Sequence, residues 1–124
     1  MGLHQSGEDY LESILKLQEQ GAAVRSIDVA TDLGYSKPSV SVAMKKLRES
    51  GHIQVDDLGI ITLTDAGRVV AERTWDRHRT LANFFVRLGV DEAVAQVDAC
   101  KVEHDLSDET FEKLLLHVKE NSKP

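Results

Sequence analysis

The chain has 124 residues, of which 41% are hydrophobic and 29% are charged, a composition typical of a globular protein with one domain or two very small ones. Its single cysteine excludes an internal disulfide, so we expect a reducing, cytoplasmic environment. The sequence contains no apolar run of the roughly 20 residues that span a membrane, no Gly-rich phosphate loop, no paired-Cys metal knuckle and no G-x-S-x-G motif. It therefore predicts neither a membrane protein nor an enzyme with a small-molecule substrate.

Three helices are predicted in the first part of the chain. Apolar residues at helical spacing predict an amphipathic helix over residues 8–19. A short helix follows, with Ser26 as its expected N-cap and Gly34 as its end. Ser36 is then expected to cap a helix over residues 37–50.

The pattern changes from helical to alternating after this point. Residues 52–64 contain two short runs of β-branched and apolar residues around a turn, which predicts a β-hairpin. Helices joined by a tight Gly turn and followed by a hairpin make a winged helix-turn-helix. The remaining predicted elements are a long helix from Thr64 or Asp65 to about Leu88, a helix from Asp91 to about Asp105, and a last helix that begins at Ser107.

The charge of the chain is unevenly distributed. The net charge is −6, which as a whole argues against a nucleic-acid partner. Between Ser36 and Arg48, however, there are four cations and no acidic residue. This basic segment coincides with the second helix of the predicted helix-turn-helix, the element that enters the major groove in DNA-binding proteins of this class.

The predicted helix over residues 37–50 has two different faces. Apolar residues from Val40 to Leu47 form one face, and the opposite face is small near its start and basic further on. Small hydroxyl and methyl groups can reach base edges, whereas lysines neutralise phosphates. We expect DNA contacts from Ser36, Lys37, Pro38, Ser39, Ser41, Val42, Lys45 and Lys46.

The alternative interpretation is a winged helix that binds protein and keeps its basic face in solvent. Asp56 and Asp57 at the predicted tip of the hairpin indicate that this wing does not press on a phosphate.

A second candidate site lies further along the chain. Cys100, Glu103 and His104 have the i, i+3, i+4 spacing that places a thiol, a carboxylate and an imidazole on one helix face. These groups together suit a divalent transition metal. The alternative is a buried cysteine and a hydrogen-bonded core histidine, because Cys100 and His104 continue an apolar stripe at Ala93 and Val97.

Three further residues have the right chemistry for a metal but no distinctive spacing. Asp9 and Glu12 share one face of the first predicted helix, a pattern typical of solvated carboxylates. His78 lies between Trp75 and Leu81 on the apolar side of its helix, as a core histidine would.

Residues 8–120 resemble the diphtheria-toxin-repressor and manganese-transport-regulator family of metal-activated repressors. The most specific motif is Cys-x-x-Glu-His-x-x-Ser, which begins at Cys100. The matching strings are EDYLESILKL, SIDVATDLGYSKPSVSVAMKKL, GIITLTDAGR, DRHRTLANFF, LGVDEA and DACKVEHDLSDE.

The resemblance implies a metal site and the kind of ion that it takes. The carboxylate at Asp9 resembles the manganese branch of the family, whereas Cys100 resembles the iron branch. We therefore expect Mn²⁺ or Fe²⁺, with Co²⁺ and Zn²⁺ as substitutes in vitro. The ancillary site of the iron branch is absent, since Ala82 and Gln96 stand at the matching positions. The implied ligands are Asp9, Glu12, His78, Cys100, Glu103 and His104.

These patterns together predict a mainly α protein. We expect a winged helix-turn-helix with a β-hairpin wing over residues 1–64, a linker helix over 65–90, and an all-helical metal-binding and dimerisation domain over 91–124. A homodimer through residues 91–118 would bind palindromic operator DNA and regulate metal-ion homeostasis. Two alternatives stay open: a metal-independent winged-helix repressor with structural ligand-like residues, and a metallohydrolase, which would need an open metal position in a substrate cleft.

Overall fold

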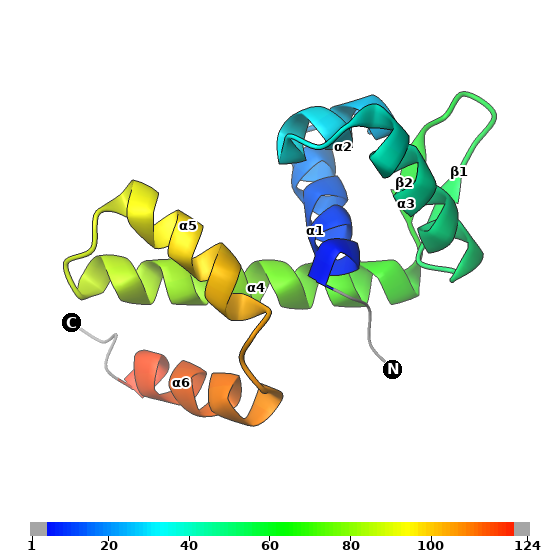
Figure 1. The fold of residues 1–124 in the computed structure, drawn as a ribbon. Coiled ribbons are helices and arrows are strands. Elements are labelled where there is room, and N and C mark those ends of the chain that lie inside the picture. The colour runs from blue at the N-terminus through cyan, green and yellow to red at the C-terminus, as the bar shows by residue number, and fades with distance from the viewer. Residues whose placement is uncertain (1–4, 121–124) are drawn as a thin grey trace. The chain divides into compact units, whose positions relative to one another are not determined.

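The computed structural model describes residues 5–120, so residues 1–4 of the predicted range 1–64 and residues 121–124 of the predicted range 91–124 lie outside the described residues. The chain is mainly helical with one small sheet, as predicted (Figure 1). It forms two compact units, the first ending at Thr74 and the second beginning at Trp75. The elements are α1 (Gln5–Glu19), α2 (Ser26–Leu33), α3 (Lys37–Glu49), β1 (Ile53–Val55), β2 (Ile61–Leu63), α4 (Asp65–Arg87), α5 (Glu92–Glu103) and α6 (Asp108–Glu120).

The first unit is a winged helix-turn-helix. The apolar face of α1, formed by Leu11, Ile14 and Leu15, is buried. It packs with α2, α3 and β2, which removes their apolar side chains from water and holds the unit together. The other buried apolar residues of this core include Val24, Val29, Ala30, Val40, Met44, Leu47, Ile53 and Ile61.

The turn between α2 and α3 follows the prediction, whereas the start of α2 departs from it. Gly34 has the left-handed conformation (φ 72°) that ends α2, and the Ser36 hydroxyl accepts a hydrogen bond from the Ser39 amide at the start of α3. The prediction that Ser26 caps α2 is wrong, because Ser26 is already helical and Arg25 is the N-cap. The Asp28 carboxylate accepts from the Arg25 amide (2.9 Å), so this helix start uses an acceptor inside the helix.

The wing is an antiparallel hairpin in which Val55 pairs with Ile61 and Ile53 pairs with Leu63. The predicted hairpin is confirmed, although its strands are shorter than the 52–64 range. The Asp56 carboxylate accepts hydrogen bonds from the amides of Leu58 and Ile60, each at 2.9 Å. Asp56 therefore closes the turn of the wing.

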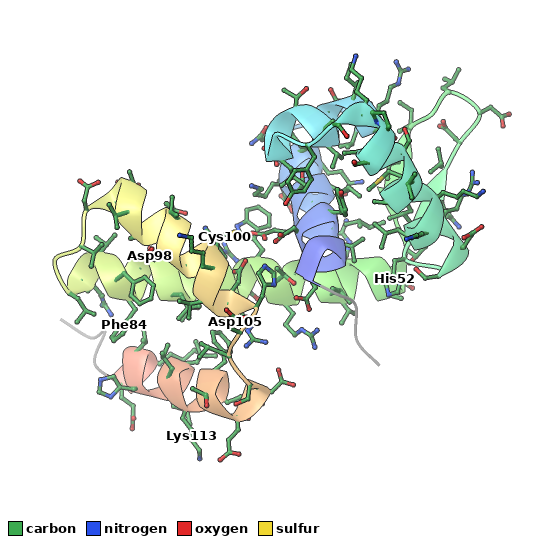
Figure 2. All side chains as sticks on the ribbon, in the orientation of Figure 1. His52, Phe84, Asp98, Cys100, Asp105 and Lys113 are labelled. Atoms are coloured by element: carbon green, nitrogen blue, oxygen red, sulfur yellow. The ribbon has the colours of Figure 1, made fainter. Side chains whose placement is uncertain are left out.

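The start of α4 lies against the loop that follows α3. The Thr64 hydroxyl accepts from the Gly67 amide (3.1 Å), and Thr64 donates to the Gly51 carbonyl (2.6 Å). A Cβ atom on Gly67 would lie 1.9 Å from the backbone oxygen of His52, near the N-terminal end of α4 in Figure 2. Only glycine allows this approach of two backbone segments.

Gly67→Ala is accordingly expected to lower the free energy of unfolding by about 1–3 kcal/mol, the usual cost of forcing atoms into a packed site. The loss should occur even though alanine is the better helix former by about 1 kcal/mol. Urea denaturation followed by circular dichroism measures it. As a control, Ala66→Gly at the exposed neighbouring position should cost only the helix-propensity difference. A Gly67→Ala midpoint equal to that of the wild type would show that the two segments are not in contact.

In the second unit, α5 and α6 pack on the C-terminal half of α4. The predicted helix starts are confirmed, since Asp91 accepts from the Ala93 amide and Ser107 accepts from the Thr110 amide. The buried cluster consists of Leu81, Ala82 and Ala99, with Phe85, Val102, Leu106, Phe111 and Leu114 packed against it.

Arg77 of α4 joins this core to the loop before α6. Its guanidinium donates to the Leu106 carbonyl (2.9 Å) and to the Asp108 carboxylate (3.2 Å). The same group lies 4.7 Å from the centre of the Phe111 ring, a cation–π distance. These contacts fix the loop after α5 and the start of α6 on the α4 surface.

The buried face of α5 differs from the predicted one. The residues that face the core are Ala95, Ala99 and Glu103, whereas Val97 in the expected apolar stripe is 55% exposed. Hydrophobicity favours the valine face, but the alanine face is the one that packs with Leu81 and its neighbours. Val94 and Val97 of α5 thus remain on the surface of the described chain, whereas Val102 packs against the core.

Candidate metal centre and nucleic-acid interface

The second unit brings together the predicted ligands of α4 and α5. Cys100, Glu103 and His104 lie in the last turn of α5 and at its C-cap, and their ligand atoms are within 4.8 Å of one another (Cys100 is labelled in Figure 2). One Glu103 oxygen is 3.2 Å from His104 Nε2, and the other is 3.6 Å from His78 Nδ1. A thiol, a carboxylate and two imidazoles therefore converge.

Glu103 is the unusual member of this cluster. Its side chain is only 1% exposed, yet neither carboxylate oxygen has a hydrogen-bond partner among the described residues. His78 Nδ1 is likewise buried without one. Buried polar atoms are nearly always paired, because leaving a carboxylate unpaired away from water is costly.

A divalent transition metal fits these residues. Carboxylate, imidazole and thiolate are its usual protein ligands, and positive charge at this position would compensate the unpaired Glu103 oxygens. The alternative of a buried cysteine and a hydrogen-bonded core histidine accounts for Cys100 and His104, but it leaves the Glu103 carboxylate unexplained.

Gln96 contacts the cluster, although no sequence motif assigns it a role there. Its side-chain oxygen is 2.6 Å from His78 Nε2, the ring nitrogen that points away from Glu103. Gln96 stands one turn before Cys100 on α5, so helical spacing places both on one side of the helix. That spacing is the only sequence signal that could have identified it.

The other two predicted ligands belong to α1 of the first unit. Asp9 and Glu12 are three residues apart on this helix, and Glu12 is buried. Between them, Tyr10 stacks edge-on with Tyr35. Burial raises the pKa of the Tyr10 hydroxyl, and the nearby charges of Tyr35 and Asp9 raise it further.

The predicted DNA-binding face of α3 is exposed, and its apolar face is buried. Ser36 uses its hydroxyl within the helix cap, since it also donates to the Ser39 hydroxyl (2.8 Å). Within residues 5–120, none of the four cations of this segment takes part in an ion pair. The exposed residues are Ser36, Lys37, Pro38, Ser39, Ser41, Val42, Lys45 and Lys46.

No helix among the described residues is both long enough and apolar enough to cross a membrane.

Two family models match the chain in succession. The N-terminal DNA-binding domain of iron-dependent repressors matches residues 2–58. The metal-binding and dimerisation domain of iron-dependent repressors matches residues 64–123.

Individual relatives agree with these matches. An uncharacterized HTH-type transcriptional regulator of Methanocaldococcus jannaschii is 37% identical over 118 residues, 94% of either chain. The transcriptional regulator MntR of Salmonella typhimurium is 33% identical over 92% of this chain and 73% of its own. Among solved structures, a manganese-dependent transcriptional repressor in complex with manganese is 31% identical with a TM-score of 0.84, covering 91% of this chain and 52% of that one.

A winged helix-turn-helix joined to a helical unit with clustered candidate metal ligands defines a class of metal-responsive DNA-binding proteins. The chain belongs to the iron-dependent repressor family, whose members are metal-dependent transcriptional regulators. The predicted resemblance is thereby confirmed. The chain spans about half the length of the solved manganese-dependent repressor.

Proposed function

We propose that this protein represses genes of metal-ion homeostasis by binding palindromic operator DNA as a homodimer when Mn²⁺ or Fe²⁺ is bound. The observation that carries the proposal is the buried Glu103 carboxylate, which faces two imidazole nitrogens and has no hydrogen-bond partner in the described chain. The proposed ligands are Asp9, Glu12, His78, Cys100, Glu103 and His104.

The ligand set divides between the two units. Asp9 and Glu12 come from α1, whereas the other four come from α4 and α5. The ion, when bound, supplies positive charge that offsets the mutual repulsion of the carboxylates from both units. Because α1 packs with α2 and α3, its two carboxylates connect the proposed site to the DNA-binding helices.

DNA binding would use the exposed face of α3. Val42 is 56% exposed and can contact a thymine methyl group, and the Ser41 hydroxyl can reach a base edge. Lys45 and Lys46 follow one turn later, where they can neutralise phosphates. In a two-fold dimer, two copies of α3 would sit about 34 Å apart, one turn of DNA.

Exposed apolar residues in the second unit support the homodimer. Val94, Val97 and Leu116 are each about half exposed, and all three lie within residues 91–118. Apolar surface on a small unit indicates a protein interface, and a two-fold contact would cover it in both copies. Sedimentation equilibrium at micromolar concentration should find a dimer, and a monomer with and without metal would refute this part of the proposal.

The function is tested by titrating a fluorescent DNA duplex with the protein. The duplex is first selected from a random library by protein in Mn²⁺, and anisotropy is then measured with Mn²⁺, Fe²⁺, Co²⁺, Zn²⁺ or a chelator. An allosteric coupling of ordinary size predicts 5–150-fold tighter binding with the activating ions, that is about 1–3 kcal/mol. Equal affinity in chelator would establish the metal-independent repressor instead.

The residues expected to contact phosphates and those expected to contact base edges lead to different predictions. Lys45→Ala and Lys46→Ala should weaken binding to all sequences and reduce its salt dependence by about one unit of slope per lost phosphate contact. Ser41→Ala and Val42→Ala should instead relax the preference among operator sequences. The control is Lys101→Ala, an exposed lysine of α5. A salt slope unchanged by both α3 lysine substitutions would show that this part of α3 does not face the DNA backbone.

A further inference from the structure

The His78 ring is held between an acceptor on each side. Its Nε2 atom is 2.6 Å from the Gln96 side-chain oxygen, and its Nδ1 atom is 3.6 Å from a Glu103 oxygen. Gln96 is exposed, whereas Nδ1 and both Glu103 oxygens are buried. The metal site proposed above uses Glu103 and His78 but assigns nothing to Gln96.

The Gln96 contact determines where the imidazole carries its proton. A glutamine oxygen can only accept a hydrogen bond, so the facing Nε2 must be the donor. A neutral imidazole has one N–H, and a proton on Nε2 leaves Nδ1 with a free lone pair. That lone pair points toward the Glu103 carboxylate, and a lone pair is what a metal ion requires of a histidine ligand.

The opposite tautomer would compete with metal binding. A proton on Nδ1 would point at the Glu103 oxygen 3.6 Å away, and a small shift of either side chain would let the two buried groups form a hydrogen bond without any ion. His78 and Glu103 would then be hydrogen-bonded to each other, and neither would be available to a metal ion. An acceptor on the far side of the ring opposes this state because it needs the proton at Nε2.

We infer that Gln96 is a positioning residue that holds His78 in its metal-binding tautomer. The inference rests on the proposed metal site, and it assigns Gln96 the task that a carboxylate or carbonyl oxygen performs behind most metal-bound histidines. Because the acceptor is a side-chain amide on the surface of α5, it can be replaced without opening the core.

Two substitutions at this position separate the acceptor from the rest of the side chain. Gln96→Leu removes the acceptor, and Gln96→Glu keeps an oxygen acceptor and makes it stronger. The control is Gln54→Leu, which removes an exposed amide from β1 in the first unit. The tautomer of His78 is read from long-range ¹H–¹⁵N NMR of the metal-free protein at about pH 8.5, where an ordinary imidazole is neutral. Mn²⁺ affinity is measured separately from the electron paramagnetic resonance signal of the free ion.

The wild type and Gln96→Glu should show the proton on Nε2, and Gln96→Leu should shift it toward Nδ1. Mn²⁺ should bind about 10–100-fold more weakly to Gln96→Leu, the usual loss for an outer-shell partner, while Gln96→Glu and Gln54→Leu stay at least as tight as the wild type. A wild-type proton on Nδ1, or Gln96→Leu affinity within about twofold of the wild type, would overturn the inference. A wild type that binds no Mn²⁺ would contradict the proposed metal site itself. A His78 tautomer that is the same in Gln96→Leu as in the wild type would contradict only the inference.

Discussion

Glu103→Gln is expected to stabilise the metal-free protein and to abolish its response to metal ions. In the structure the Glu103 carboxylate is buried, and neither oxygen has a hydrogen-bond partner in the described chain. Glutamine has nearly the same shape and carries no charge, and its amide nitrogen can donate to one of the two facing imidazoles while its oxygen faces the other. Removing the unpaired charge should raise the free energy of unfolding by about 1–3 kcal/mol.

The same substitution removes a ligand from the proposed site. DNA binding by Glu103→Gln in Mn²⁺ should therefore fall to the level that the wild type shows in chelator, a loss of about 5–150-fold. Thermal unfolding in chelator and anisotropy in Mn²⁺ measure the two effects. Glu112→Gln, an exposed carboxylate of α6, is the control and should change neither. Loss of stability in chelator, with the metal response retained, would show that Glu103 serves as the structural partner of a protonated histidine.

Cys100 is expected to determine which metal ions activate the protein. A thiolate is a soft ligand, whereas the carboxylates of the proposed site are hard. Cys100→Glu should therefore raise the DNA-binding response to Mn²⁺ relative to Co²⁺ and Zn²⁺. Cys100→Ala should weaken Co²⁺ and Zn²⁺ binding most, by about 10-fold or more, since the five other proposed ligands still suit a harder ion.

Cobalt gives a direct optical measurement of this ligand. A cobalt–thiolate bond produces an intense near-ultraviolet charge-transfer band, and Cys100 is the only cysteine of the chain. The band should appear when Co²⁺ is added to the wild type and should be absent from Cys100→Ala. A wild-type Co²⁺ complex without the band, together with an unchanged metal response in Cys100→Ala, would identify Cys100 as a packing residue.

Local signals predicted the elements well, because caps and glycines act over a few residues. Ser36, Asp91 and Ser107 cap the helices at which the sequence places them, and Thr64 is one of the two starts predicted for α4. The exposed basic face of α3 also follows from helical periodicity alone, since its opposite face is apolar.

Three features that depend on contacts between distant residues were not predicted. Glu103 is buried although charge normally keeps a residue at the surface, and only the arrangement of α4 and α5 shows which face of α5 is covered. The sequence gives no sign that Gly67 differs from other helical glycines, because the His52 carbonyl that leaves no room for a Cβ atom comes from another segment. The pairing of Gln96 with His78 joins positions 18 apart in sequence, and no local pattern connects them.

The proposed coupling of metal and DNA is tested most directly by its reciprocity. If Mn²⁺ strengthens DNA binding by a given factor, thermodynamic linkage requires DNA to strengthen Mn²⁺ binding by the same factor. The measurement is the Mn²⁺ dissociation constant of the wild type, taken from the free-ion resonance signal with and without saturating selected duplex. We expect the duplex to lower that constant about 5–150-fold, by the same factor that anisotropy gives for Mn²⁺ acting on DNA binding. An Mn²⁺ dissociation constant that is the same with and without the duplex would show that the metal site does not control DNA binding.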